Sequence, residues 1–111
     1  MNPTLAAAIT EKQFMQQITD LAHLKGWITY HSFDSRRSAP GFPDLVLARQ
    51  GPYGPGNSSV IFAELKTTKG KTTPAQRTWI DALDTGNDMC ASHIAVVWSP
   101  ADWPTIERAL Q

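Results

Sequence analysis

The sequence predicts a fold of the α/β (α+β) class in which a mixed sheet is flanked by helices. Two segments open with a T-x-x-Q capping box, which is typical of a helix N-terminus. Four short runs are rich in β-branched and aromatic residues, which favours strands. One helical segment lies between the third and fourth runs, so the order is helix, three strands, helix, strand, helix. The chain has 111 residues, which predicts one domain over residues 1–111.

The first helix is predicted to begin at the capping box T-E-K-Q, residues 10–13, and to end at Gly26. The second is predicted to begin at T-P-A-Q, residues 73–76, with Pro74 at the first helical position, and to end near Gly86. Apolar residues follow both caps at helical spacing. They are Phe14, Ile18, Leu21 and Ala22 in the first helix, and Trp79, Ile80 and Leu83 in the second.

Four runs of the sequence are predicted to be strands. They are residues 27–33, 42–49, 60–66 and 93–99. The first three are joined by a polar loop, residues 34–41, and a glycine- and proline-rich loop, residues 50–59, so we expect an antiparallel meander. Pro43 is placed at the start of the second run, where a missing backbone N–H is tolerated. The helix at residues 74–86 then crosses over to a parallel fourth strand, and a short last helix follows, kinked or restarted at Pro104.

The overall composition argues against several classes of protein. The formal net charge is zero, which argues against a strongly basic nucleic-acid-binding protein. The apolar runs are far shorter than the ~20 residues of a membrane span, and the N-terminus has no basic segment of the kind that opens a signal peptide. Cys90 is the only cysteine, so we expect no intrachain disulfide and no cysteine-based zinc site. An intracellular, cytoplasmic location fits these features best.

Positive charge is concentrated in the middle third of the chain. Residues 36–77 contain seven basic and two acidic side chains, which gives this segment a net charge of +5. A basic region within a neutral chain suits a polyanion bound at one face. A solvated surface that is basic by chance is the alternative.

Three charged residues, Asp44, Glu64 and Lys66, lie in two runs that otherwise have the pattern of buried strands. Because side chains alternate along a strand, Glu64 and Lys66 point to one face of the sheet. Asp44 is at the start of the neighbouring antiparallel strand, so the three groups are expected to converge. Two carboxylates this close need a cation or a shared proton, and Mg²⁺ takes such oxygen ligands. The grouping suits metal-assisted phosphodiester hydrolysis; an ion pair at a sheet edge is the alternative.

These residues lie in motifs that resemble those of the VRR-NUC nucleases, a branch of the PD-(D/E)XK superfamily. The motifs are G-F-P-D at residues 41–44, A-E-L-K at residues 63–66 and G-K-T-T-P-A-Q at residues 70–76. They follow one another in the family's order, and the predicted α-β-β-β-α-β order is that of the restriction-endonuclease-like core of the superfamily. The resemblance covers about residues 10–110.

The resemblance implies a catalytic metal site. Asp44 and Glu64 would bind Mg²⁺ or Mn²⁺, with the backbone carbonyl of Leu65 as a further ligand. Lys66 would position the attacking water. Gln76 would also take part in catalysis, although its place in the second capping box is sufficient to explain a glutamine there.

Glu11 is the remaining candidate for the catalytic site. Its position falls within the apolar stripe of the first helix, so we expect it to face inward. First-helix glutamates complete the metal site in many relatives, as an outer group or at a second metal. The alternative is a first-turn glutamate that only favours the helix dipole. His31 lies near the presumed site, but we do not include it among the metal ligands.

Positively charged residues around the motifs are expected to meet DNA phosphates, and one tyrosine in the long loop is a candidate for a further contact. The predicted DNA-binding residues are Arg36, Arg37, Lys69, Lys71, Arg77 and Tyr53. The four tryptophans are expected to pack in the core.

The sequence therefore predicts a Mg²⁺- or Mn²⁺-dependent endodeoxyribonuclease that acts on branched DNA, such as Holliday junctions or flaps. A role in phage or bacterial replication, recombination or repair, in the bacterial or phage-infected cytoplasm, is implied by the family's compact stand-alone members. We expect a homodimer, and Trp103 and Ile106 on the last helix either pack on the sheet or face a second copy. Two alternatives remain open: a catalytically silent DNA-binding module and an RNA-directed nuclease.

Overall fold

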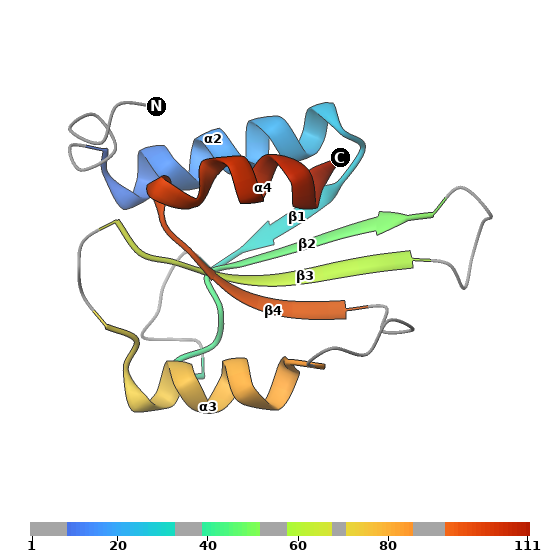
Figure 1. Cartoon of the computed structure of the whole chain (residues 1–111). Coiled ribbons are helices and arrows are strands. Elements are labelled where there is room, and N and C mark those ends of the chain that lie inside the picture. Colours follow the sequence, from blue (N-terminus) through green and yellow to red (C-terminus); the bar gives the residue numbers. More distant parts are fainter. Residues whose placement is uncertain (1–8, 33–38, 52–57, 68–70, 86–92) are drawn as a thin grey trace.

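The computed structural model describes residues 9–32, 39–51, 58–67, 71–85 and 93–111. The described helices are α2 (Glu11–Leu24), α3 (Pro74–Leu83) and α4 (Trp103–Leu110), and a 3-10 turn, η1 (Pro100–Asp102), precedes α4. The described strands are β1 (Ile28–His31), β2 (Leu45–Gln50), β3 (Ser58–Leu65) and β4 (His93–Trp98). The order of elements is the one predicted from the sequence (Figure 1).

The four strands form one mixed sheet in the order β1-β2-β3-β4. β1, β2 and β3 are an antiparallel meander, and β4 pairs with β3 in parallel. Leu45 lies opposite Ala63 at the end of the β2–β3 ladder. The same register, continued by one residue, brings Asp44 opposite Glu64. The predicted α+β class and the predicted strand directions are therefore confirmed.

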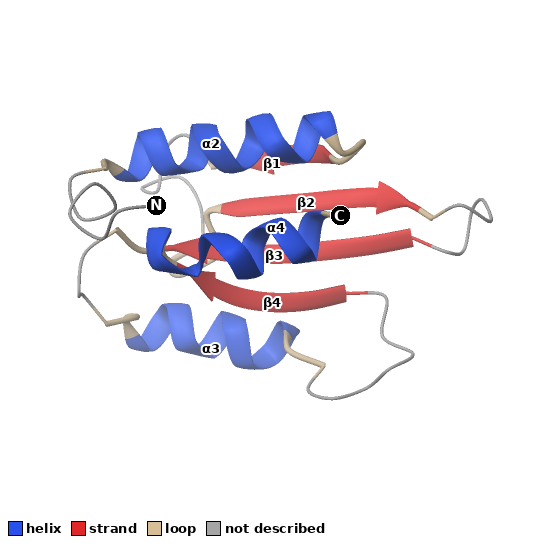
Figure 2. Ribbon diagram, turned by 45° about the horizontal axis from the view of Figure 1, so that its top comes forward, coloured by secondary structure: helices blue, strands red, loops and turns tan. Residues whose placement is uncertain are grey.

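The two faces of the sheet are covered unequally. α2 and α4 lie together on one face, whereas α3 lies on the other, next to β3 and β4 (Figures 1 and 2). The core lies between the sheet and the α2–α4 pair, where apolar side chains from both layers are buried. Its members include Phe14, Ile18 and Ala22 of α2, Leu45, Leu47, Ile61, Ala63 and Leu65 of the strands, and Ile106 and Leu110 of α4.

Both predicted capping boxes are present. In α2 the N–H of Gln13 donates to Thr10 Oγ1 at 3.0 Å, and the N–H of Thr10 donates to Gln13 Oε1 at 2.9 Å. Thr73 and Gln76 make the equivalent pair at the start of α3. Gly26 follows α2 with a φ of 86°, a conformation that favours glycine after a helix. α4 begins at Trp103, with Pro104 in its first turn, so the chain restarts a helix at this proline.

The predicted boundaries are wrong at the segment that carries Asp44. The second strand begins at Leu45, three residues later than expected. The reason is a turn: Gly41 has a φ of 82°, and the N–H of Phe42 donates to the carbonyl of Ala39 at 3.3 Å. Asp44 is thus the last residue before β2 and is not a strand residue. Smaller differences are the shorter β1, the start of β3 at Ser58 and the end of α3 at Leu83.

Within the described part of the chain, no helix is long and apolar enough to cross a membrane. Trp27 and Trp98 are buried, and Trp103 packs against the core, as expected for tryptophans that stabilise the fold. Trp79 is half-buried on α3, where it contacts Phe42. Ile106 is fully buried, so the choice left open for the last helix is decided in favour of ordinary packing.

Candidate active site

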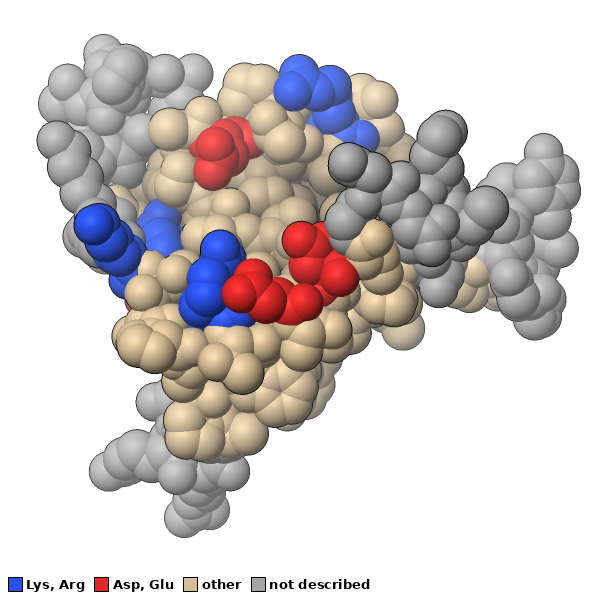
Figure 3. All heavy atoms as spheres, turned by 60° about the horizontal axis from the view of Figure 1, so that its bottom comes forward, with Lys and Arg blue, Asp and Glu red and all other residues tan. Residues whose placement is uncertain are grey.

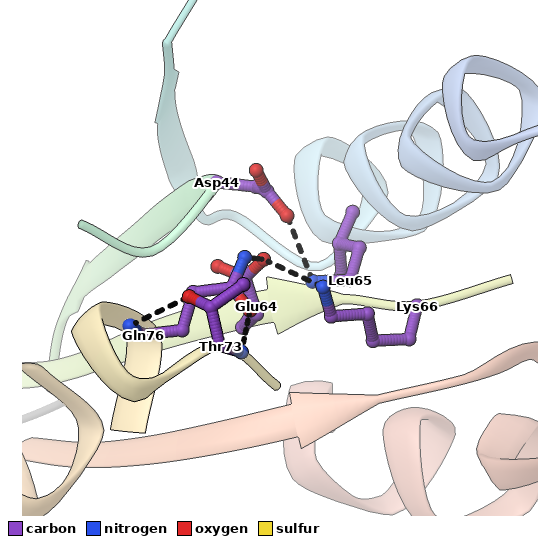
Figure 4. A network of polar contacts seen from close by, with 6 residues as sticks. All are labelled: Asp44, Glu64, Leu65, Lys66, Thr73 and Gln76. Carbon is purple, nitrogen blue, oxygen red and sulfur yellow. Dashed lines mark hydrogen bonds and ion pairs between the residues drawn. The ribbon is translucent and has the colours of Figure 1, made fainter. Parts of the chain in front are cut away.

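Asp44 and Glu64 converge at the point where β2 begins and β3 ends (Figure 4). Asp44 Oδ2 accepts a hydrogen bond of 2.9 Å from the backbone N–H of Leu65, the residue that follows Glu64. This contact fixes the Asp44 carboxylate next to the last residues of β3. The predicted convergence of the two motifs across the hairpin is confirmed.

The turn that carries Asp44 is seated on the first turn of α3. A Cβ atom on Gly41 would collide with the backbone carbonyl of Ala75, so only glycine allows this approach. The ring of Phe42 meets the ring of Trp79 edge-on, with a centroid distance of 5.0 Å, and that of Phe62 at 6.4 Å. These contacts connect the G-F-P-D segment to α3 and to β3, and so they set the position of Asp44.

Glu64 is a carboxylate almost completely removed from solvent, with 2% of its surface exposed. One of its oxygens, Oε1, accepts a hydrogen bond of 2.8 Å from Gln76 Nε2 and lies 3.8 Å from Lys66 Nζ. The other oxygen, Oε2, is buried and, when Glu64 is ionised, has no hydrogen-bond partner among the described residues. Buried oxygens of this kind are rare in native proteins and call for an explanation, such as an ion.

The pKa of Glu64 is raised to about 8, first by burial and then by the charge of Asp44 and a hydrogen bond shared with its carboxyl group, whereas the positive charge of Lys66 acts in the opposite direction. Removal from water disfavours the charged form of a carboxyl group, and a second negative charge disfavours it further. Two carboxylates in this position therefore share a proton or require a cation.

Glu11 lies beside this pair but not as predicted. The residue is exposed in the first turn of α2 and does not face into the core. Its pKa is nevertheless raised, first by the partial burial of its carboxyl group and then by Asp44, while Lys66 lowers it. The predicted inward orientation is only partly realised, because position 11 is the first helical residue, at the end of the α2 stripe. The carboxyl group still belongs to the electrostatic surroundings of Asp44 and Glu64.

Gln76 completes the helix cap and also contacts the candidate site. Its Oε1 accepts the N–H of Thr73 at 2.8 Å and so completes the capping box, while its Nε2 donates to Glu64. The two ends of one amide group serve the helix cap and the site at the same time (Figure 4).

The donor set suits a hard divalent cation. Among the described residues, no three His, Cys, Asp or Glu side chains gather into a complete metal-binding group. Mg²⁺ does not require one, because it is commonly held by one or two carboxylates and completes its shell with water and substrate phosphate. The orphaned Oε2 of Glu64 beside the carboxylate of Asp44 fits this pattern.

The predicted DNA-binding residues are only partly accounted for. Arg36, Arg37, Tyr53 and Lys69 lie outside the described residues. Lys71 is exposed, and Arg77 forms an exposed ion pair with Asp81 on α3, at 3.6 Å. Figure 3, which views the molecule from the side of α3, shows positive and negative side chains intermixed there. The described residues of this side therefore do not form a uniformly basic surface.

Two contributions to the site were missed by the sequence analysis. Phe42 is the aromatic residue of the G-F-P-D motif, and its contact with Trp79 of α3 could be seen only in the tertiary structure. The hydrogen bond from Gln76 Nε2 to Glu64 is the second, because the capping box predicted at Thr73 and Gln76 is sufficient to explain the glutamine without it.

The comparison with protein families matches residues 3–98 to the VRR-NUC domain. The mixed four-stranded sheet with flanking helices is consistent with the PD-(D/E)XK-like fold of that family. No curated protein and no solved structure matched the chain.

Proposed function

Because the chain belongs to the VRR-NUC domain family and is a nuclease-type domain, we propose that it is a Mg²⁺- or Mn²⁺-dependent endonuclease that hydrolyses phosphodiester bonds in branched DNA. The observation that carries the metal-dependent part is the buried, unpartnered Oε2 of Glu64 beside Asp44. The ion pair with Lys66 does not supply a partner for Oε2, because Lys66 Nζ lies near the other oxygen, Oε1, at 3.8 Å.

In this proposal Asp44 and Glu64 hold the cation, and the carbonyl of Leu65 is a further ligand. When bound, the cation supplies Lewis-acid stabilisation of the charge that develops on the phosphate. Lys66 orients the attacking water, and its partly exposed side chain, at 23% exposure, gives it access to solvent. Glu11 contributes negative charge next to Asp44, as an outer group or toward a second metal.

The test compares Asp44→Ala, Glu64→Ala and Lys66→Ala with the wild-type protein in cleavage of labelled four-way junctions, flaps and duplexes in the presence of Mg²⁺ or Mn²⁺. We expect each variant to lose cleavage by at least about 100-fold, because each removes a ligand or the water-orienting group. Circular dichroism establishes that the variants are folded. Wild-type rates in all three variants would falsify the assignment of the site.

Two further candidate functions are distinguished by the same substrates. A catalytically silent DNA-binding module would bind the junction and cleave nothing at any metal concentration. The intact Asp44, Glu64 and Lys66 disfavour this candidate. An RNA-directed nuclease would cleave the RNA counterpart of the best DNA substrate at least as fast, so that RNA belongs in the panel.

The proposed partners are branched DNA, bound without sequence preference, and a second copy of the chain. One protomer has one candidate site and therefore cuts one strand, whereas symmetric pairing supplies two sites to one junction. A role in phage or bacterial DNA repair or recombination, in the cytoplasm, completes the proposal. Arg36, Arg37, Lys69, Lys71, Arg77 and Tyr53 remain the predicted DNA contacts.

A further inference from the structure

The amide group of Gln76 has two different ends, and the structure assigns a partner to each. Oε1 accepts the backbone N–H of Thr73 at 2.8 Å, and Nε2 donates to Glu64 Oε1 at 2.8 Å. The hydroxyl of Thr73 accepts the backbone N–H of Gln76 at 3.2 Å, which closes the capping box. The side chain is thus held at the backbone, at the carboxamide oxygen and at the carboxamide nitrogen.

Only one orientation of this amide satisfies both partners. A rotation by 180° would turn Oε1 toward the carboxylate of Glu64 and Nε2 toward the N–H of Thr73. Two acceptors would then face each other on one side and two donors on the other. The backbone N–H of Thr73, which cannot change from donor to acceptor, therefore selects the orientation in which Gln76 donates to Glu64.

The consequence for Glu64 concerns which oxygen is free to bind a ligand. Oε1 is engaged by Gln76 and faces Lys66, whereas Oε2 is buried without a partner among the described residues. A carboxylate with one oxygen fixed by a hydrogen bond cannot rotate about its last bond without losing that bond. The free oxygen is therefore presented in one direction.

We propose that Gln76 is a positioning residue that acts through Glu64: held by the N–H of Thr73, it binds Oε1 and so reserves Oε2 for a divalent cation. This inference rests on the proposed function only in taking a divalent cation as the ligand. It differs from a direct catalytic role, because Gln76 touches Glu64 and not the reacting phosphate or water. Partners of this kind that hold metal-binding side chains in place typically change metal affinity by about 10- to 100-fold.

The chain contains a matched control for the test, because α2 begins with the same T-x-x-Q box. Gln13 makes the same two capping contacts with Thr10, at 2.9 and 3.0 Å, but its side chain is exposed on another helix. Gln76→Ala and Gln13→Ala each remove one capping box. Only Gln76→Ala removes a hydrogen bond to Glu64.

The measurement is the binding of Mn²⁺, and separately of Mg²⁺, to the full chain by isothermal titration calorimetry without DNA. We expect Gln76→Ala to weaken Mn²⁺ binding by about 10-fold or more, and Gln13→Ala to leave it within about 2-fold of wild type. Both variants should lower the melting temperature, and Gln76→Ala by more, because it also leaves the buried Glu64 Oε1 without its hydrogen bond. Equal Mn²⁺ affinity in Gln76→Ala and wild type would overturn the proposal.

A second pair of variants isolates the N–H of Thr73. Thr73→Ala and Thr73→Pro both remove the hydroxyl, but only Thr73→Pro also removes the N–H that orients Gln76. The φ of Thr73 is −73°, which proline adopts without strain. We expect Mn²⁺ affinity to fall further in Thr73→Pro than in Thr73→Ala. Equal affinities in these two folded variants would contradict the orienting role of the N–H.

Asp44→Ala and Glu64→Ala separate this inference from the proposed function. If both abolish Mn²⁺ binding while Gln76→Ala does not weaken it, the metal site stands and the positioning role fails. If neither affects Mn²⁺ binding, the metal site itself is wrong, and the positioning role falls with it. If Thr73→Pro does not fold, the comparison of Gln76→Ala with Gln13→Ala still decides whether Gln76 positions Glu64 for the cation.

Discussion

Glu64 shows at the scale of one residue how the fold prepares a site by burying a carboxyl group that is costly to ionise without a cation. It is surrounded by protein, it has Asp44 as a neighbour, and one of its oxygens has no partner among the described residues. Such a group costs stability in the absence of a ligand. A bound cation would remove this cost, so the same burial that destabilises the metal-free protein favours cation binding.

This argument predicts a specific pH dependence of stability in the metal-free protein. The folded pKa of Glu64, about 8, is above the value of 4.5 for a free glutamate. Between these values the native state keeps a proton that the unfolded state has lost. The stabilising contribution is therefore complete below about pH 4.5 and is lost as the pH rises through about 8, at up to about 1.4 kcal/mol per pH unit.

Urea unfolding in EDTA from pH 5 to pH 9 measures this dependence. We expect Glu64→Gln to lose less stability than wild type as the pH rises, because glutamine does not titrate. Glu107→Gln, an exposed change on α4, is the control and should follow the wild type. Parallel stability curves for Glu64→Gln and wild type would show that Glu64 does not titrate in this range.

Two glycines with similar backbone conformations offer a second test at this scale. Gly26 and Gly41 have φ values of 86° and 82°, but a Cβ on Gly26 would meet only the side chain of Arg49, at 3.9 Å. Gly26→Ala is expected to lower the free energy of unfolding by about 1–2 kcal/mol, which is the strain of placing alanine in this backbone conformation. Gly41→Ala adds a clash with the backbone of α3 and is expected to cost about 2–5 kcal/mol.

Chemical denaturation gives both costs, and Mn²⁺ binding gives the effect on the site. Gly41→Ala should also weaken Mn²⁺ binding, since it moves Asp44 away from Leu65, whereas Gly26→Ala should not. Equal costs for the two substitutions would mean that the segment before Asp44 does not need its close approach to α3.

At the scale of the element, periodicity and capping residues were sufficient to predict most of the fold. Both capping boxes, the four strands and their directions are where the sequence indicated. The start of β2 was missed because a turn at Gly41 depends on the surface of α3, which is remote in the sequence. The exposure of Glu11 was missed because helical periodicity does not tell which residues at the end of a stripe are covered. The convergence of Asp44 and Glu64 was predictable from strand register, but the double role of Gln76 required the geometry of one amide.

Arg49 illustrates a basic residue whose role is to connect elements. Its guanidinium lies over the ring of Trp27, 4.4 Å from the centroid, and donates to the carbonyls of Lys25, Leu110 and Gln111. β2 is thereby attached to the ends of α2 and α4. Arg49 contributes to the positive charge of the middle segment, yet these contacts indicate a structural function.

We therefore predict that one basic residue, Arg49, affects stability and that another, Lys71, affects DNA binding. Arg49→Gln should lower the free energy of unfolding by about 1–3 kcal/mol, because three carbonyls and the ring of Trp27 lose a charged partner. Lys71→Gln, at an exposed position, should leave stability unchanged and reduce the salt dependence of DNA binding by about one phosphate contact. Denaturation curves and fluorescence anisotropy at several salt concentrations measure the two effects. A smaller salt dependence in Arg49→Gln would place Arg49 at the DNA.

At the scale of the whole molecule, large apolar side chains are exposed at both edges of the sheet and at the end of α2. Among the described residues these are Leu24, Ile28, Tyr30 and Ile94. Leu24, Ile28 and Tyr30 lie at the end of α2 or on β1, the edge strand, and are 65–80% exposed. Exposed apolar residues that are grouped in this way often mark an interaction surface. The last helix does not provide such a surface, because Ile106 is in the core.

The predicted homodimer can be tested at this edge. We expect light scattering at micromolar concentration to give the mass of a dimer, and the double substitution Ile28→Ser and Tyr30→Ser to give that of a monomer, because it removes the apolar area available for pairing. Ile94→Ser, on the opposite edge strand, is the control and should remain dimeric.

With a four-way junction as substrate, the dimer should nick two strands and the monomeric variant one. A wild-type monomer with and without the junction would contradict paired cleavage, whereas a double variant that stays dimeric but binds the junction weakly would assign β1 to DNA. The metal site formed by Asp44 and Glu64 does not depend on either outcome, since both residues come from one chain.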